Sequence, residues 1–143
     1  MKKNVLVVLL IFAGAYAAMG QEVGIRFGDV NGSNAAVDGI FSTGRFSRIH
    51  ADVSFSSGIG VDALWDFLYR PIDEEEFFWY VGAGPFIFLG DDFALGAAGE
   101  IGIEYHFMQA PVALGLDWRP YFRIMDNTDV FFGGFGFNVR YVF

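Results

Sequence analysis

The sequence predicts an all-β protein, an eight-stranded antiparallel up-and-down transmembrane β-barrel with a polar, side-chain-filled interior. Three observations lead to this prediction. Apolar and polar residues alternate through most of residues 21–143, the apolar half of each predicted strand carries no charge, and the chain begins with the pattern of a secretory leader. Alternation with a period of two is typical of strands with two different faces. A charge-free apolar face suits contact with lipid.

Composition narrows the class of protein. The chain has 143 residues, of which 54% are hydrophobic, 19% aromatic and 18% charged, the last below the roughly 25% usual for soluble domains. A single domain fits this length, and so apolar a chain excludes intrinsic disorder. Cysteine is absent, which excludes disulfides and thiolate metal sites.

Residues 1–20 read as a signal peptide. Lysines at positions 2 and 3 precede an uninterrupted apolar run over residues 5–18, and small residues flank positions 16 and 19. The run is shorter than the ~20 residues that a membrane-spanning helix needs. We therefore expect cleavage near Ala17 to Gly20 and a barrel domain over residues 21–143. That domain contains seven Arg, no Lys and 17 acidic residues, a net charge of −10, which excludes nucleic acid as a partner.

The first four predicted strands are separated by turns rich in Gly, Ser and Asp. They span residues 22–27, 35–41, 48–55 and 59–70, and their polar faces carry Glu22 and Arg26, then Asp38, then Arg48, His50 and Asp52, then Asp62 and Asp66.

Four more predicted strands bring the total to eight. They span residues 77–89, which are apolar on both faces, 93–108 with Glu100, Glu104 and His106, 112–122 with Asp117 and Arg119, and 131–143 with Arg140. Short connections between an even number of strands predict a meander that closes into a barrel and so has no free edge. Because proline removes a ladder donor, we expect a bulge near Pro85 and the extracellular end of a strand at Pro120.

The charged faces are predicted to point inward. Eight strands enclose room for side chains only, so the interior is a polar core and not a pore, and its charges must pair. The predicted lumen network consists of Glu22, Arg26, Asp38, Arg48, His50, Asp52, Asp62, Asp66, Glu100, Glu104, His106, Asp117, Arg119 and Arg140. A four-residue turn at 108–111 places Glu100 opposite Arg119 and Gly102 opposite Asp117.

Aromatic residues gather near both ends of the predicted strands, as in the girdles of membrane barrels. One rim would carry Phe41, Tyr69, Trp79, Tyr105, Phe107, Tyr141 and Phe143, and the other Phe27, Phe55, Phe93, Trp118, Phe122 and Phe131.

The chain ends Gly136-Phe137-Asn138-Val139-Arg140-Tyr141-Val142-Phe143. With the strand pattern, this ending resembles the small eight-stranded outer-membrane barrels of the OmpA/OmpX type and the broader outer-membrane protein β-barrel domain families. Val139, Tyr141 and Phe143 match the alternating terminal signal that the barrel assembly machinery reads, whereas Asn138 departs from the glycine often found there. The resemblance implies a Gram-negative outer-membrane location, with outer-membrane lipid and the assembly machinery as partners. We expect a monomer.

No catalytic, cofactor or metal site is predicted. His50, Asp52 and Ser54 have the composition of a catalytic triad, but alternate positions of one strand place the outer two about 13 Å apart. The acidic run at 73–76 lacks the spacing of a calcium loop. We therefore expect a non-enzymatic protein with a structural or an envelope- or lipid-interacting role. The alternatives are an enzyme that modifies outer-membrane lipid and a secreted soluble barrel that carries an apolar ligand.

Overall fold

The computed structural model describes residues 21–30, 32–125 and 128–143, so the predicted signal peptide and its cleavage site lie outside the described residues. Within that part of the chain all regular elements are strands, and none is a helix long and apolar enough to cross a membrane. The strands are β1 (Gln21–Val30), β2 (Ser33–Gly44), β3 (Ser47–Phe55), β4 (Gly58–Ile72), β5 (Glu74–Gly90), β6 (Phe93–His106), β7 (Val112–Trp118), β8 (Tyr121–Arg123), β9 (Asp129–Phe131) and β10 (Phe135–Val142).

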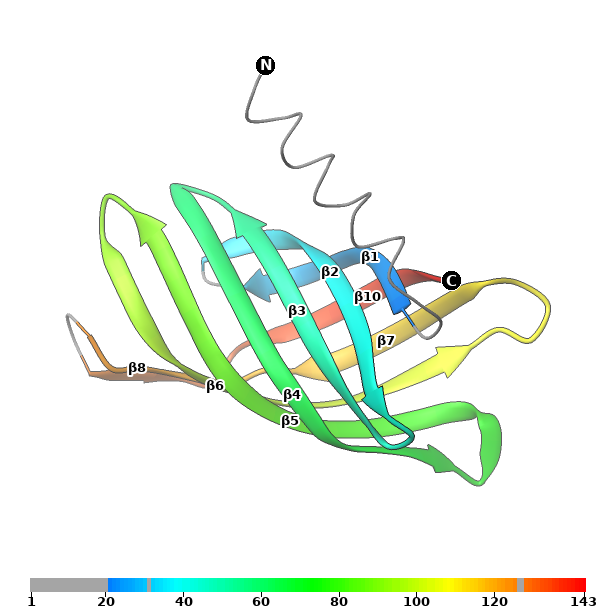
Figure 1. Ribbon diagram of the computed structural model, residues 1–143. Coiled ribbons are helices and arrows are strands. Elements are labelled where there is room, and N and C mark those ends of the chain that lie inside the picture. Colours follow the sequence, from blue (N-terminus) through cyan, green and yellow to red (C-terminus); the bar gives the residue numbers. More distant parts are fainter. Residues whose placement is uncertain (1–20, 31, 126–127) are drawn as a thin grey trace, which may run out of the picture.

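Eight of these strands close into an antiparallel barrel, which confirms the predicted fold (Figure 1). Neighbours follow the order β5-β4-β3-β2-β1-β10-β7-β6, and a β5–β6 pairing completes the ring. The first and last strands pair at a seam, where the Phe143 N–H donates to the Gln21 carbonyl at 3.0 Å. We call the end of the barrel that holds this contact the terminal end. The opposite end, where β1–β2, β3–β4, β5–β6 and β8–β9 are connected, is the mouth end.

The two additional strands continue barrel strands past interruptions. Ile101 pairs with Trp118 on β7, and Gly96 pairs with Arg123 on β8 in the same register, so β8 extends β7. β7 thus ends at Trp118, close to the end expected at Pro120, but the wall of the barrel continues beyond the proline as β8. Proline lacks the donor, but its carbonyl still accepts from the Gly99 N–H at 2.9 Å, so the ladder bridges the gap.

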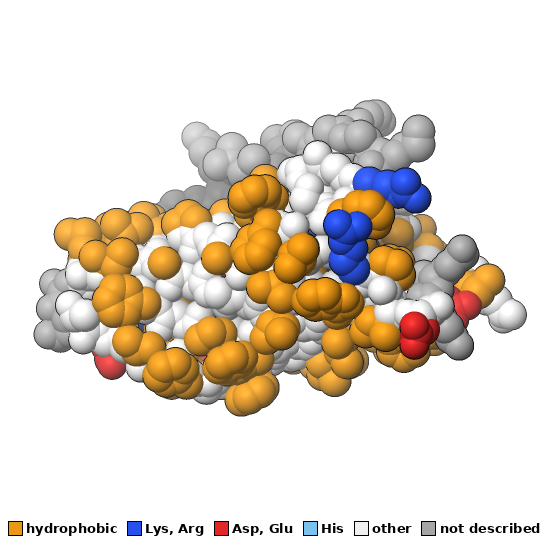
Figure 2. All heavy atoms as spheres, turned by 90° about the horizontal axis from the view of Figure 1, so that it is seen from below, with side chains coloured by type: hydrophobic (Ala, Val, Ile, Leu, Met, Phe, Trp, Pro, Cys, Tyr) orange, Lys and Arg blue, Asp and Glu red, His pale blue; other side chains and the backbone are white. Residues whose placement is uncertain are grey.

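Apolar side chains lie on the outside of the barrel and charged side chains on the inside. Large apolar side chains lie exposed on the outer surface, with Trp65 56% and Leu116 54% accessible, whereas the Arg26 side chain inside is 0% accessible. Figure 2 shows one side of the barrel, where hydrophobic side chains cover much of the wall and most of the visible charged side chains lie toward one end. The alternation read from the sequence thus separates an apolar exterior from a charged interior.

Two register shifts move aromatic side chains that were predicted to face outward to the lumen side of the barrel wall. A bulge between Asp66 and Leu68 places Phe67 and Leu68 both outward, so the Tyr69 hydroxyl points inward, 3.3 Å from His106 Nε2. The expected place of Tyr69 in an outer girdle is therefore wrong, because an extra residue reverses the faces of a strand.

The second reversal concerns Phe131, which was also expected to face outward. Trp118 pairs with Phe135, but beyond Gly134 the register changes by one residue, and Phe131 pairs with Tyr121. The two rings lie 4.9 Å apart on the lumen side of the hairpin. A bulge was expected near Pro85, but this exposed proline lies in an unbroken β5–β6 ladder that has no register shift.

Candidate functional site

The structure places the side chains of the predicted lumen network inside the barrel. Thirteen of the fourteen are buried, and His106 is partly exposed at the terminal end. The buried members are Glu22, Arg26, Asp38, Arg48, His50, Asp52, Asp62, Asp66, Glu100, Glu104, Asp117, Arg119 and Arg140. They come from seven different barrel strands, so the network ties the wall together from within.

Arg119 is the centre of the first ion cluster. It follows β7, whose predicted register with β6 is confirmed by the pairing of Gly102 with Asp117. Its Nη2 donates to Glu100 at 2.9 Å, and its Nη1 bonds Asp52 and lies 3.3 Å from Asp62. The expected Glu100–Arg119 contact is therefore present, but it is one of three carboxylate contacts that this guanidinium makes.

His50 bridges two carboxylates beside this cluster. Its Nε2 lies 2.6 Å from Asp38 Oδ1 and its Nδ1 lies 2.9 Å from Glu100 Oε1. An ionised carboxylate only accepts hydrogen bonds, so between two ionised partners both ring nitrogens donate and the imidazole is a cation. Both nitrogens are thereby occupied, and His50 is held as a structural cross-link between β2 and β6.

Arg48 and Arg140 form a second cluster toward the terminal end. Arg48 donates to Asp66 and to Glu104, each at 2.7 Å. Arg140 donates to Glu22 at 2.7 Å and to Asp38 at 3.1 Å, and it also bonds Glu104. Glu104 and Asp38 are therefore shared between cations, which is the arrangement that makes buried charges tolerable.

Arg26 and Asp117 form a more isolated pair across β10. Arg26 Nε lies 3.1 Å from both carboxylate oxygens of Asp117, and its Nη2 lies 2.5 Å from one of them. Asn138 Nδ2 donates to the same carboxylate at 2.9 Å. The remaining Arg26 donors reach the carbonyls of Asp29 at 2.9 Å and Gly134 at 3.3 Å. This bidentate pair is the strongest geometry that a guanidinium and a carboxylate can adopt.

Close packing around a tyrosine fills the space between the clusters. Tyr80 is fully buried, with the Arg48 guanidinium 4.5 Å from its ring centroid and the His50 ring 6.2 Å away. A Cβ on Gly102 would lie 2.4 Å from the tyrosine hydroxyl, so only glycine fits there. The middle of the lumen is thus occupied by side chains.

Among the described residues, three groups of side chains could hold a metal ion. Their ligand atoms lie within 4.8 Å of one another in the sets Glu22, Glu104 and His106; Asp38, His50 and Asp52; and His50, Asp66 and Glu100. Each set includes a carboxylate that already pairs with an arginine. The ion pairs account for this arrangement without a metal.

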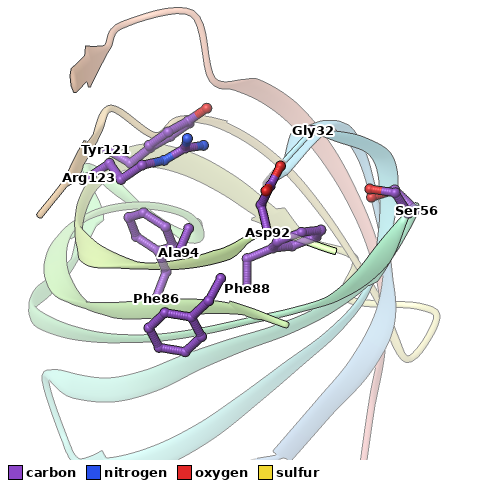
Figure 3. Close-up of a pocket in the computed structure, with 10 residues that line it drawn as sticks. Gly32, Ser56, Phe86, Phe88, Asp92, Ala94, Tyr121 and Arg123 are labelled. Carbon is purple, nitrogen blue, oxygen red and sulfur yellow. The ribbon is translucent and has the colours of Figure 1, made fainter. Parts of the chain in front are cut away.

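The lumen is different at the mouth end, where the structure has a cavity of about 540 Å³ (Figure 3). Phe86 and Phe88 from β5 and Tyr121 from β8 supply aromatic surface. Arg123 projects over it from one side, and Asp92 stands across from it. The volume lies within the range typical of small-molecule pockets.

An apolar layer separates this cavity from the ion network. Leu64, Phe86, Ala94 and Ala98 form a buried cluster, against which Tyr121 packs. The Phe86 and Tyr121 rings meet edge to face at 5.4 Å. The cavity therefore ends on an apolar floor rather than on the charged network.

Three features of the lumen were not predicted from the sequence: the inward positions of Tyr80 and Asn138, and the mouth cavity. Position parity could have found the first two, since Tyr80 shares its face with Phe78 and Phe86, and Asn138 shares its face with Arg140. The inward aromatic residues of β5 were also a signal that one part of the lumen is apolar. What brings β8 over them is the strand stagger, which the sequence pattern does not contain.

Comparison with known proteins found no family model, no curated protein and no solved structure that matches the chain.

Proposed function

We propose that the protein is a small integral β-barrel of the Gram-negative outer membrane, non-enzymatic and without an open pore, with a structural or an envelope- or lipid-interacting role. One observation carries the proposal: a closed barrel with an apolar exterior and a buried ion network. A barrel in water would expose polar residues, whereas one in lipid reverses this distribution. The reversal favours an integral barrel over a secreted soluble carrier.

The C-terminal strand supports the same proposal. Val139, Tyr141 and Phe143 all lie exposed on the outer face of β10 or directly after it, beside the seam. Recognition by the barrel assembly machinery would need these side chains to be accessible in this way. We propose the assembly machinery and outer-membrane lipid as partners, and a monomer as the functional unit.

The closed interior supports a role without transport or catalysis. Clusters centred on Arg119 and Arg140 fill the lumen between the mouth cavity and the terminal end. His50, one of the two histidines that could serve a hydrolase as a base, has both nitrogens bound to carboxylates, and the Nε2 of the other, His106, lies 2.8 Å from Glu104. The network therefore suits a rigid core better than a proton path or a lipid-modifying site.

Membrane fractionation of a Gram-negative host that expresses the full chain tests the proposal. We expect the protein in the outer-membrane fraction after a carbonate wash, and a gel mobility that changes on boiling, as a detergent-resistant barrel shows. Recovery in the soluble periplasmic fraction without detergent would contradict the proposal and favour the soluble carrier.

A further inference from the structure

Arg123 differs from the other arginines of the barrel interior. Arg26, Arg48, Arg119 and Arg140 each lie within 4 Å of a carboxylate, whereas Arg123 has no such partner among the described residues. Its Nε is buried and makes no hydrogen bond within that part of the chain. Asp129 lies opposite Arg123 in the β8–β9 pair but makes no ion pair with it, so this half-buried guanidinium keeps donors that an anion could fill.

The surroundings of Arg123 define the rest of that anion. The cavity wall beside it is built from the rings of Phe86, Phe88 and Tyr121 (Figure 3). Aromatic faces bind flat apolar groups, and a guanidinium pairs best with a planar carboxylate. On the far side, Asp92 and the hydroxyl of Ser56 can accept a hydrogen bond from a ligand donor.

We propose that the mouth cavity binds a small amphipathic acid. Its carboxylate would pair with Arg123, its apolar body would lie on Phe86 and Phe88, and a hydroxyl or amino group at its other end would face Asp92. The site goes beyond the proposed function, because it assigns a ligand class to one end of the barrel. Phe86 and Ala94 of the buried apolar cluster line the cavity, which makes it a site of capture rather than an entrance to a channel.

Binding of 6-hydroxy-2-naphthoate tests the proposal, since this probe has the carboxylate, the flat body and the distal donor. The purified protein is placed in phosphatidylcholine nanodiscs, or in buffer if it fractionates as soluble, and binding is measured by equilibrium dialysis against empty nanodiscs. We expect saturable binding with one site per chain, weaker at high salt. The neutral analogue 2-naphthol should bind at least about tenfold more weakly, because it lacks the charge-assisted hydrogen bonds.

Three variants separate the parts of the site. Arg123→Gln should weaken naphthoate binding by about tenfold or more, and Arg123→Lys should retain part of it. Phe88→Ala should weaken the acid and 2-naphthol alike, since it removes apolar surface without changing charge. Arg70→Gln, on the outside of the barrel, is the matched control and should bind like the unchanged protein.

A change in gel mobility on boiling equal to that of the unchanged protein verifies that each variant is folded. Absence of saturable binding above empty nanodiscs would overturn the proposal, as would equal binding by Arg123→Gln and the unchanged protein. Because the assay runs in nanodiscs or in buffer, its failure is distinct from a failure of the protein to reach the outer membrane.

Discussion

The Arg26–Asp117 pair allows the energetics of the lumen to be measured at one contact. Replacing Arg26 with Met leaves the Asp117 carboxylate buried without its bidentate partner. Replacing Asp117 with Leu leaves the Arg26 guanidinium buried without a carboxylate partner. Breaking a buried pair from one side costs about 3–5 kcal/mol. We expect each single variant to lower the free energy of unfolding by that amount.

The double variant should lose far less than the two single losses added together, because no unpaired charge remains. What it still lacks are the Arg26 hydrogen bonds to the carbonyls of Asp29 and Gly134 and the Asn138 bond to Asp117. At about 1 kcal/mol for each of the three bonds, the double variant should lose about 3 kcal/mol, whereas independent losses would sum to about 6–10 kcal/mol.

Urea unfolding from detergent micelles, followed by tryptophan fluorescence, measures these free energies. A second cycle serves as the control: Arg119→Met combined with Glu100→Leu should recover little, because Asp52 and Asp62 still face the emptied position. Losses that simply add in the Arg26–Asp117 cycle would refute the reasoning, since they would mean that the two residues do not share a contact.

Three further outcomes are expected. Ile101→Arg on the outer wall should lower stability by about 2–4 kcal/mol in lipid vesicles, whereas Met108→Arg, in an exposed turn at the terminal end, should have little effect; equal tolerance would contradict a lipid-facing wall. Phe143→Ser should reduce outer-membrane levels measured by fractionation without changing export to the periplasm, and normal insertion would exclude an assembly signal here. Gly102→Ala should destabilise the barrel by about 1–3 kcal/mol in urea, because the new methyl group meets a buried tyrosine ring, whereas Gly99→Ala, whose nearest neighbour atom would lie 3.7 Å away, should be nearly neutral.

The inward and outward faces of each strand were predictable from the sequence, because in most strands all charged residues lie on the same face. In β6, Glu100 and Glu104 leave no choice of face, so the register with β7 followed from a single turn length. The prediction of faces from alternating positions was wrong where both faces of a strand are aromatic or apolar. Around Phe67 and Phe131, an extra residue reverses the faces without placing a charge on the outer surface of the barrel, and nothing in the pattern opposes the change.

The partners of each charge were less predictable than its location. Glu100 lies on β6 and Arg119 directly follows the adjacent β7, so their pairing follows from register. His50, in contrast, contacts Asp38 and Glu100 on two other strands. The stagger of all eight strands decides which side chains meet across the lumen. That stagger depends on every turn and bulge together, which local alternation does not specify.

The seam between β1 and β10 has a consequence for the order of folding. The Arg140–Glu22 bond joins residues separated by 118 positions, so almost the whole chain lies between the two halves of this contact. Until β10 docks, the carboxylate of Glu22 has no guanidinium beside it, and the polar side of every strand already in place is open to its surroundings. In the membrane that we propose for this barrel, a partly assembled sheet would expose these charges to hydrocarbon, a state far less stable than the closed ring. Closure of the ring should therefore be cooperative, because the first strand has its second neighbour only when β10 has docked.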